Sequence, residues 1–100
     1  MTGFKLDARA RLSIELALTS NSGDDHLMRR LEKGARTLGM TGAEIDMARS
    51  GSSFDFQLSK AIALALAPHS ERRACAMTAG IEAQVCAEIE TIAASYVDPD

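Results

Sequence analysis

Few side chains in this sequence have the chemistry of a catalyst or of a metal ligand. The 100 residues include two histidines, two cysteines and no tryptophan. Neither His26 nor His69 has a carboxylate or a cysteine three or four residues away, which is the spacing that a helical metal site would use. No glycine-rich phosphate loop and no nucleophile elbow is present. The sequence therefore predicts no metal and no cofactor, and it leaves open whether the chain is an enzyme.

Glu15 and His26 are the two candidate acid–base residues. Glu15 lies beside an apolar stripe formed by Ile14, Ala17 and Leu18. A carboxylate half-buried there between helices would have a raised pKa and could serve as a general base. The alternative is a carboxylate that reaches water at the edge of the stripe. His26 stands near the start of the next predicted helix, where it is the second candidate.

Cys75 and Cys86 are the only thiols. On one continuous helix they would be separated by about 16 Å of rise, whereas a disulfide requires Cα atoms within about 7 Å. We therefore expect two buried, reduced thiols, which fits a reducing cytosol. Arg72 and Arg73 precede Cys75 and would slightly favour its thiolate form.

The elements that carry these residues are all predicted to be helices. The apolar fraction is 46% but aromatic residues make up only 4%, so alanine, leucine, isoleucine and methionine must form the core. Alanine and leucine are strong helix formers. We predict one all-α domain over residues 1–100, with about five to six helices.

The first half of the chain contains three predicted helices. The first runs from Asp7, its N-cap, to Thr19 and is followed by turn-forming residues at 19–23. The second opens at Asp24 and Asp25, where carboxylates meet the positive end of the helix dipole, and stops at Gly39. Its expected buried stripe comprises Leu27, Leu31, Ala35 and Leu38. A capping box formed by Thr41 and Glu44 then starts a short helix that carries Ile45 and Ala48 and ends at residues 50–53.

The second half contains one clear helix and one ambiguous helical region. The clear helix ends at Pro68 and carries Phe54, Leu58, Ile62, Ala65 and Leu66. Ser70 and Glu71 open the last region, which continues to residues 98–99. Its apolar face comprises Met77, Ile81, Val85, Ile89, Ile92 and Tyr96. Gly80 lies within this face, and the periodicity favours one uninterrupted helix because a glycine costs only about 1 kcal/mol relative to alanine; two helices hinged at Gly80 are the alternative.

The charge distribution argues against nucleic-acid binding. The net charge is −3 and the pI is near 5.3, which disfavours binding to phosphate backbones. Arg29, Arg30, Lys33 and Arg36 form a solvated basic face that is interleaved with acidic residues, so a helix-turn-helix DNA-binding role is not expected. No apolar run approaches the roughly 20 residues of a membrane span, and no secretory signal is recognisable. We expect a cytoplasmic protein that binds neither nucleic acid nor membranes.

Several segments resemble the alkylhydroperoxidase D-like and carboxymuconolactone decarboxylase family. Residues 34–45 look like the family's alanine-rich helix that ends at a glycine and is followed by Thr-x-x-Glu-Ile. Residues 50–67 resemble its next helix, and residues 79–89 resemble the start of its terminal helix. The resemblance covers roughly residues 9–95. It implies a compact helical domain that forms oligomers, and it implies a break near Gly80, contrary to the periodicity.

The chain lacks the Cys-x-x-Cys-x-x-x-His motif of that family. Counting back from Gly39 places Asp24 and Leu27 at the cysteine positions and Leu31 at the histidine position. A shift by one residue brings Gly23 and His26 to the cysteine positions and Arg30 to the histidine position. This alignment restores neither the cysteines nor the histidine of the motif. In peroxidase members the cysteine pair reduces a peroxide while the histidine and an upstream glutamate relay protons. The resemblance therefore implies a member without disulfide-based peroxidase activity, and without the histidine that the decarboxylase branch keeps.

The leading hypothesis is a non-redox helical protein with a binding or structural role that forms homo-oligomers and has a small molecule as its ligand. The predicted apolar stripes exceed what a 100-residue monomer comfortably buries. The rival hypothesis is a small-molecule lyase, isomerase or decarboxylase-like enzyme that uses Glu15 or His26. The resemblance also implies that Leu27 and Leu31 fill the family's redox cleft and pack against Ile14 and Leu18. Leu31→Ala would then cost about 2–5 kcal/mol of stability.

Overall fold

The computed structural model describes residues 4–20 and 23–96, and within these residues it contains six α-helices and no strand. The predicted all-α class is thereby confirmed. The helices are α1 (Ala8–Thr19), α2 (Asp25–Thr37), α3 (Gly42–Arg49), α4 (Phe56–Leu66), α5 (Ser70–Thr78) and α6 (Ala83–Ser95). The turn residues Asn21 and Ser22 and the predicted end at 98–99 lie outside the described residues.

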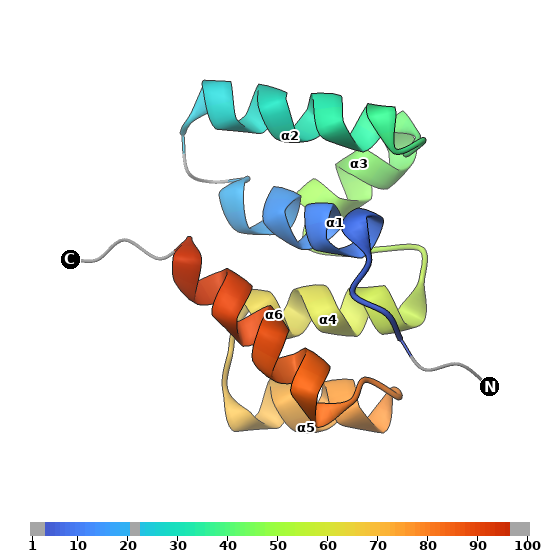
Figure 1. Ribbon diagram of the computed structural model, residues 1–100, viewed down its shortest axis with the longest axis vertical. Coiled ribbons are helices and arrows are strands. Elements are labelled where there is room, and N and C mark those ends of the chain that lie inside the picture. The colour runs from blue at the N-terminus through green and yellow to red at the C-terminus, as the bar shows by residue number, and fades with distance from the viewer. Residues whose placement is uncertain (1–3, 21–22, 97–100) are drawn as a thin grey trace.

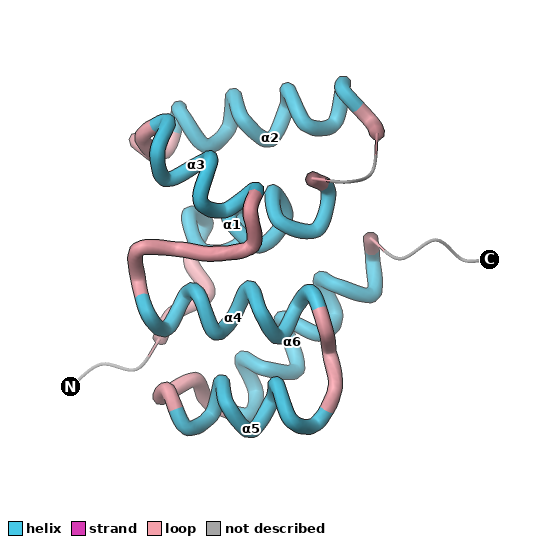
Figure 2. The backbone as a smooth tube through the Cα atoms, turned by 180° about the vertical axis from the view of Figure 1, so that it is seen from behind, coloured by secondary structure: helices cyan, strands magenta, loops and turns pink. Residues whose placement is uncertain are grey.

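The helices are arranged in two layers that form a slab of 36 × 34 × 18 Å. In Figure 1, α2 and α5 lie at opposite ends of the long axis, with α1 and α3 next to α2 and with α4 and α6 next to α5. The reverse view in Figure 2 shows α3 in front of α1 and α4 in front of α6. Helix α1 lies between the two halves and packs against α2 and α3 on one side and against α4 and α6 on the other.

The first four helices begin with side-chain caps, of which Asp7 and the Thr41–Glu44 capping box were predicted. A carboxylate oxygen of Asp7 accepts from the backbone N–H of Ala10 at 2.8 Å, and Asp24 and Asp55 cap α2 and α4 in the same way. The capping box of α3 is complete, with both Thr41 and Glu44 bonded to the other's backbone N–H. The N-caps of α5 and α6 are His69 and Glu82, and neither makes a side-chain capping bond. Ser70, expected to cap this region, is instead the first residue of α5.

The α5–α6 connection settles the question of Gly80. Helix α5 ends before Gly80, whose φ of +103° is a left-handed conformation that favours glycine. The backbone N–H of Ile81 donates to the carbonyl of Ala76 at 3.1 Å and that of Gly80 donates to Met77 at 3.0 Å, which is the Schellman pattern that ends helices. The single long helix favoured by periodicity is therefore wrong, and the break implied by the family resemblance is confirmed.

Two hydrophobic cores flank α1. The large core joins α1 to α4, α5 and α6 through twelve buried residues: Ile14, Ala17, Ala61, Ile62, Leu64, Ala65, Ala76, Ile81, Cys86, Ile89, Ile92 and Ala93. The small core joins α1 to α2 and α3 through five: Leu16, Ala35, Met40, Ile45 and Ala48. Ile14 and Leu16 are both fully buried, although they belong to different cores. One helix thus completes both halves of the molecule.

Leu38, expected in a buried stripe, is exposed instead, and so are three apolar residues of the other predicted helices. Leu38, Leu66 and Met77 are 43%, 48% and 47% exposed. Each stands at or near the C-terminal end of its helix, where the apolar stripe extends beyond the core that it faces. Phe54 is 69% exposed because it precedes Asp55, the N-cap of α4, and so does not share the helix's buried face.

Candidate functional site

A small hollow of about 190 Å³ lies between α1, α3 and the linker that connects α3 to α4. An apolar cavity of about 150 Å³ is large enough to hold benzene, so a compact small molecule fits here. The floor includes the buried side chains of Ser13, Met40 and Ala48. The walls are formed by Arg9, Glu44, Ser52, Ser53, Phe54, Asp55 and Leu58.

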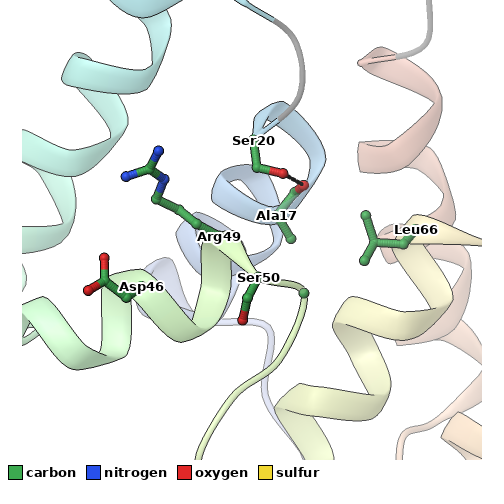
Figure 3. A pocket seen from close by; sticks show the side chains of 7 residues that line it. Ala17, Ser20, Asp46, Arg49, Ser50 and Leu66 are labelled. Atoms are coloured by element: carbon green, nitrogen blue, oxygen red, sulfur yellow. Dashed lines mark hydrogen bonds between the residues drawn. The ribbon is translucent and has the colours of Figure 1, made fainter.

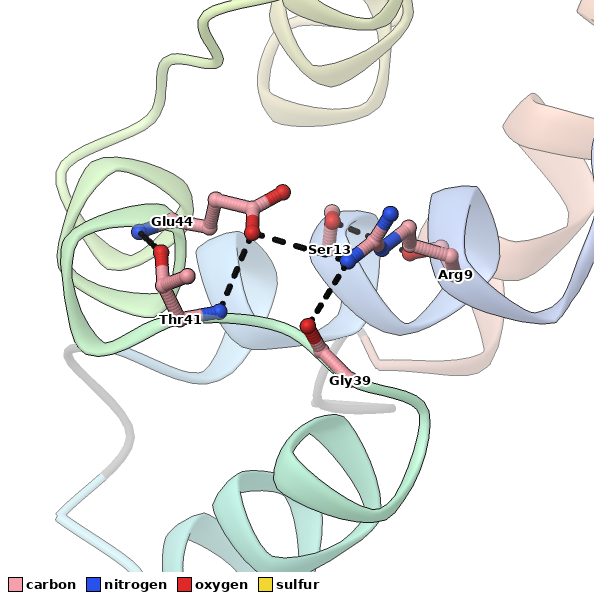
Figure 4. A network of polar contacts seen from close by, with 5 residues as sticks. All are labelled: Arg9, Ser13, Gly39, Thr41 and Glu44. Atoms are coloured by element: carbon pink, nitrogen blue, oxygen red, sulfur yellow. Dashed lines mark hydrogen bonds and ion pairs between the residues drawn. The ribbon is translucent and has the colours of Figure 1, made fainter.

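A polar network fixes one wall of this hollow (Figure 4). One guanidinium nitrogen of Arg9 donates to the carbonyl of Gly39 at 3.0 Å and lies 3.5 Å from a carboxylate oxygen of Glu44. The same oxygen accepts from the backbone N–H of Thr41 at 3.0 Å. The hydroxyl of Ser13 donates to the carbonyl of Arg9 at 2.9 Å. The capping box of α3 therefore also positions a carboxylate toward α1.

The network determines the charge of Glu44. The backbone N–H of Thr41 holds the pKa of Glu44 below its ordinary value, and the neighbouring Arg9 acts in the same direction. Glu44 is therefore ionised at neutral pH, and the wall presents a fixed pair of opposite charges. The network uses one nitrogen of Arg9 and one oxygen of Glu44, so their other polar atoms lie outside it. The hollow combines hydrogen-bonding groups of both kinds with the apolar surfaces of Met40 and Leu58.

A second concavity is an open groove of about 500 Å³ between the ends of α1, α3 and α4 (Figure 3). Asp46, Arg49 and Ser50 line its α3 side, and Leu66 lines the opposite side. The guanidinium of Arg49 is already paired with Glu32 at 3.1 Å. The groove is wide and exposed, and its polar groups do not converge on one point, so the smaller hollow is the better candidate for a binding site.

Glu15 is half-buried on α1, and its side chain is paired with Tyr96 at the end of α6. The phenolic hydroxyl of Tyr96 donates to a carboxylate oxygen of Glu15 at 2.6 Å. Burial raises the pKa of Tyr96 to about 12, and the hydrogen bond to Glu15 adds to the shift. The pair joins the first helix to the last one. Neither Glu15 nor Tyr96 lines the hollow or the groove.

The histidines are not brought together with other reactive groups. His26 is exposed in the first turn of α2, and His69 is exposed before α5. Across residues 4–20 and 23–96, no group of three histidine, cysteine or acidic side chains is placed to hold a metal ion. His26 does not line the hollow or the groove either.

The two cysteines differ in their surroundings. Cys86 is buried in the large core, as predicted, and burial raises the pKa of its thiol. Cys75 is exposed on α5, so the expectation that both thiols are buried is wrong for this residue. The cause is the break at Gly80: α5 and α6 are separate helices, and Cys75 lies on the outer side of the first one. Both thiols are free.

The residues that the resemblance assigns to the redox motif have structural roles in the fold. Asp24 caps α2, and Leu27 and Leu31 are half-buried. Leu31 packs against the small core. The expected contacts of these leucines with Ile14 and Leu18 are wrong, because those two side chains face the large core on the other side of α1.

The hollow could not be recognised from the sequence. No function is predicted there for Arg9 or Ser13, and Phe54 is placed within the helix that follows it. These residues come from α1 and the α3–α4 linker, so they meet only in the folded chain. The one available signal was the capping box at Thr41 and Glu44, which places a carboxylate at a defined point of the backbone.

None of the helices in the described part of the chain is long and apolar enough to cross a lipid bilayer. The chain matches no protein-family model, and neither the curated proteins nor the solved structures contain a match to it.

Proposed function

We propose that this chain is a non-catalytic helical protein that binds a small polar molecule in the hollow between Arg9, Ser13 and Glu44. The observation that carries the proposal is the convergence of charged and hydroxyl side chains from α1, α3 and the α3–α4 linker on one concavity of about 190 Å³. Binding sites for small molecules combine an apolar lining with a few well-placed polar groups, and this hollow has both.

The polar groups of the hollow define the ligand that fits. Arg9 offers guanidinium N–H donors, and Glu44 offers a carboxylate acceptor. The hydroxyl of Ser53 accepts from the backbone N–H of Asp55 at 3.1 Å and so keeps its own proton for a ligand. Met40 and Leu58 offer apolar contact. A compact ligand with both donors and acceptors and a short apolar portion satisfies all of these groups.

The family resemblance supports a binding role rather than a redox role. If the scaffold is that of the alkylhydroperoxidase D-like and carboxymuconolactone decarboxylase family, its cysteine and histidine positions carry Asp24, Leu27 and Leu31. None of these side chains can exchange electrons with a peroxide. Cys75 and Cys86 lie on other helices, one exposed and one buried. On this proposal the scaffold has been kept and the redox chemistry has been lost.

We also propose that the protein is a homo-oligomer. Among the described residues, Leu38, Leu66 and Met77 are large apolar side chains that are exposed and do not line the hollow. A contact between two copies of the chain that covers these side chains would remove their apolar surface from water. Size-exclusion chromatography with light scattering tests this part, and a monomer at micromolar concentration would contradict it.

The binding proposal is tested by screening small hydroxy acids, amides and polyols against the ¹⁵N-labelled chain by NMR. A ligand of the hollow shifts the amide signals of Ser13, Glu44 and Ser53. Arg9→Gln is expected to weaken its binding about tenfold, since a hydrogen bond to a charged group contributes roughly 1.5–3 kcal/mol.

Arg36→Gln is the matched control, because Arg36 is an exposed arginine of α2 that does not line the hollow. Binding equal in both variants, or shifts confined to other parts of the chain, would contradict the proposal. Melting temperatures of the two variants show whether any loss in Arg9→Gln comes from unfolding.

A second candidate function is a small-molecule lyase or isomerase, and the Glu15–Tyr96 pair is the observation that favours it. A carboxylate hydrogen-bonded to a phenol at 2.6 Å can exchange a proton with a substrate that displaces the phenol. We rank it second because Glu15 does not line the hollow. Turnover of lactones and carboxylic acids by wild type, with loss in Glu15→Gln and not in His26→Ala, would favour this candidate over binding alone.

A further inference from the structure

A separate depression of about 350 Å³ lies where the first turn of α4 meets α5. It is lined by Phe56, Lys60, Ala74, Cys75, Thr78 and Ala79, none of which lines the hollow at Arg9. Its volume falls in the range of about 300–1,000 Å³ that is common for ligand pockets.

One wall of the depression is an aromatic ring with a cation beside it. Phe56 is 66% exposed, and the ammonium nitrogen of Lys60 lies 5.4 Å from the centroid of its ring. Lys60 is the only charged residue among the six that line the depression. An exposed ring that holds a cation nearby offers a flat apolar surface and one positive charge to the same ligand.

The opposite wall is small and has little free hydrogen-bonding capacity. The hydroxyl of Thr78 donates to the carbonyl of Ala74 at 2.9 Å, so its proton is used within α5. The side-chain amide of Gln57 donates to the carbonyl of Ala79 at 2.9 Å and ties the start of α4 to the end of α5. The depression is thus held in shape, and the ammonium group of Lys60 is its one strong donor to a ligand.

We propose that this depression is a second binding site, specific for a small anion with a flat apolar body, of the class of aromatic carboxylates. The ring of the ligand packs against Phe56 and the α5 surface at Ala74 and Cys75, and its carboxylate pairs with Lys60. The site is independent of the function proposed for the hollow at Arg9, since the two share no residue.

Alkylation of Cys75 reports on occupancy, because this thiol is exposed in the depression whereas Cys86 is buried. The full chain is treated with iodoacetamide, with or without 2-naphthoate, and the modification of each cysteine is followed by mass spectrometry. The neutral analogue 2-naphthylmethanol has the same ring without the charge. We expect millimolar 2-naphthoate to slow alkylation of Cys75, and we expect the neutral analogue to bind about fivefold more weakly, as for the loss of an exposed ion pair.

Two variants assign the effect to the side chains that we name. Lys60→Gln is expected to abolish the difference between the anion and its neutral analogue, whereas Lys33→Gln, an exposed lysine on α2, leaves the difference unchanged. In Cys75→Ser, 2-naphthoate should shift the amide signals of Phe56 and Thr78, which shows binding without the thiol.

Equal protection by both compounds, or protection that survives in Lys60→Gln, would overturn the proposal of an anion site. Protection that rises with protein concentration in the absence of ligand would assign the depression to a second copy of the chain instead. An absence of protection together with unshifted amides would show that the depression binds neither compound.

Discussion

The large core and the small core lie on opposite sides of the same helix, yet they hold their neighbouring helices in different ways. The large core contains twelve buried residues from four helices and the α5–α6 turn, and the small core contains five. Helix α2 contributes only one fully buried side chain, Ala35, while Leu31 and Met28 are half-buried. Its remaining attachments include an exposed ion pair between Glu32 and Arg49, and such pairs contribute at most about 1 kcal/mol.

The comparison indicates that stability is unevenly distributed across the molecule. Local opening requires less free energy where fewer apolar contacts are buried. We therefore expect α2 to separate from α1 more readily than α4 or α6 does. The hollow at Arg9 borders the small core, so the candidate binding site lies in the half that can adjust, while the large core keeps α1 in place.

The largest difference should appear between two buried leucines. Leu64 and Leu16 are both fully buried, in the large and the small core respectively. We expect Leu64→Ala to cost about 3–5 kcal/mol, near the upper part of the range for buried leucines, and Leu16→Ala to cost about 2–3 kcal/mol because fewer surrounding side chains lose contacts. Urea denaturation followed by circular dichroism measures both. A larger cost for Leu16→Ala would reverse the ranking of the cores.

Gly39 and Gly80 end α2 and α5 in equivalent turns, one in each half of the molecule. Substituting each of them by alanine therefore compares the backbone of the two halves. Gly80 and Gly39 both have positive φ, but a Cβ at Gly80 would come within 2.7 Å of the Gln57 amide, whereas a Cβ at Gly39 meets nothing within 4 Å. Gly39→Ala should lower the free energy of unfolding by about 1 kcal/mol, from backbone strain alone. Gly80→Ala should lower it by about 2 kcal/mol, because the Gln57–Ala79 hydrogen bond is also disturbed. Thermal unfolding measures both.

Gly42→Ala is the control for this pair, since Gly42 lies at the start of α3 with open space around it and φ is not positive there. It should change the stability by less than either of the other two variants. Equal costs at Gly39 and Gly80 would show that Gln57 moves aside without loss.

Leu31→Ala tests how tightly α2 is held. Because Leu31 is half-buried rather than fully buried, we now expect a cost of about 1–2 kcal/mol instead of the range for a fully buried leucine. Hydrogen exchange should quicken in α2 and stay unchanged in α4 and α6. Uniform quickening over all helices would show that the two halves unfold as one unit.

A small effect is expected where α1 meets the end of α6. Tyr96→Phe removes the hydrogen bond to Glu15 and should cost about 1 kcal/mol. The pKa of Tyr96 is raised from 10 to about 12 in the folded chain, so the wild-type advantage is complete below pH 10 and is lost as the pH rises toward 12. The difference in urea midpoint between the two proteins should shrink over this interval; a constant difference would contradict the assigned shift.

Much of the secondary structure could be predicted because its signals are local. Asp7, Asp24 and Thr41 each cap the helix that the sequence assigned to them. The break at Gly80 was not visible to periodicity, since Met77, Ile81 and Val85 keep the helical spacing across it. A glycine within an apolar stripe has the same pattern whether it continues a helix or ends one.

The packing and the candidate site could not be predicted in the same way. A single apolar stripe was assigned to the first helix, so Leu16 and the burial of a second face were missed. The side of α1 that Leu31 contacts depends on the direction in which α2 folds back against α1. No single residue in either helix determines that direction. Arg9 and Glu44 are far apart in the sequence, and they come within 3.5 Å only when α3 has folded back against α1.

The burial of α1 on both sides also has a consequence during synthesis on the ribosome. Its small-core face can pack as soon as α2 and α3 have emerged, but its opposite face waits for α4 and is completed only by α6, the last helix to be made. At about 5–20 residues per second, the interval between the end of α1 and the start of α4 lasts roughly 2–7 s. For those seconds Ile14 and Ala17 are an apolar surface on a nascent chain, open to any chaperone that reaches it before α4 does.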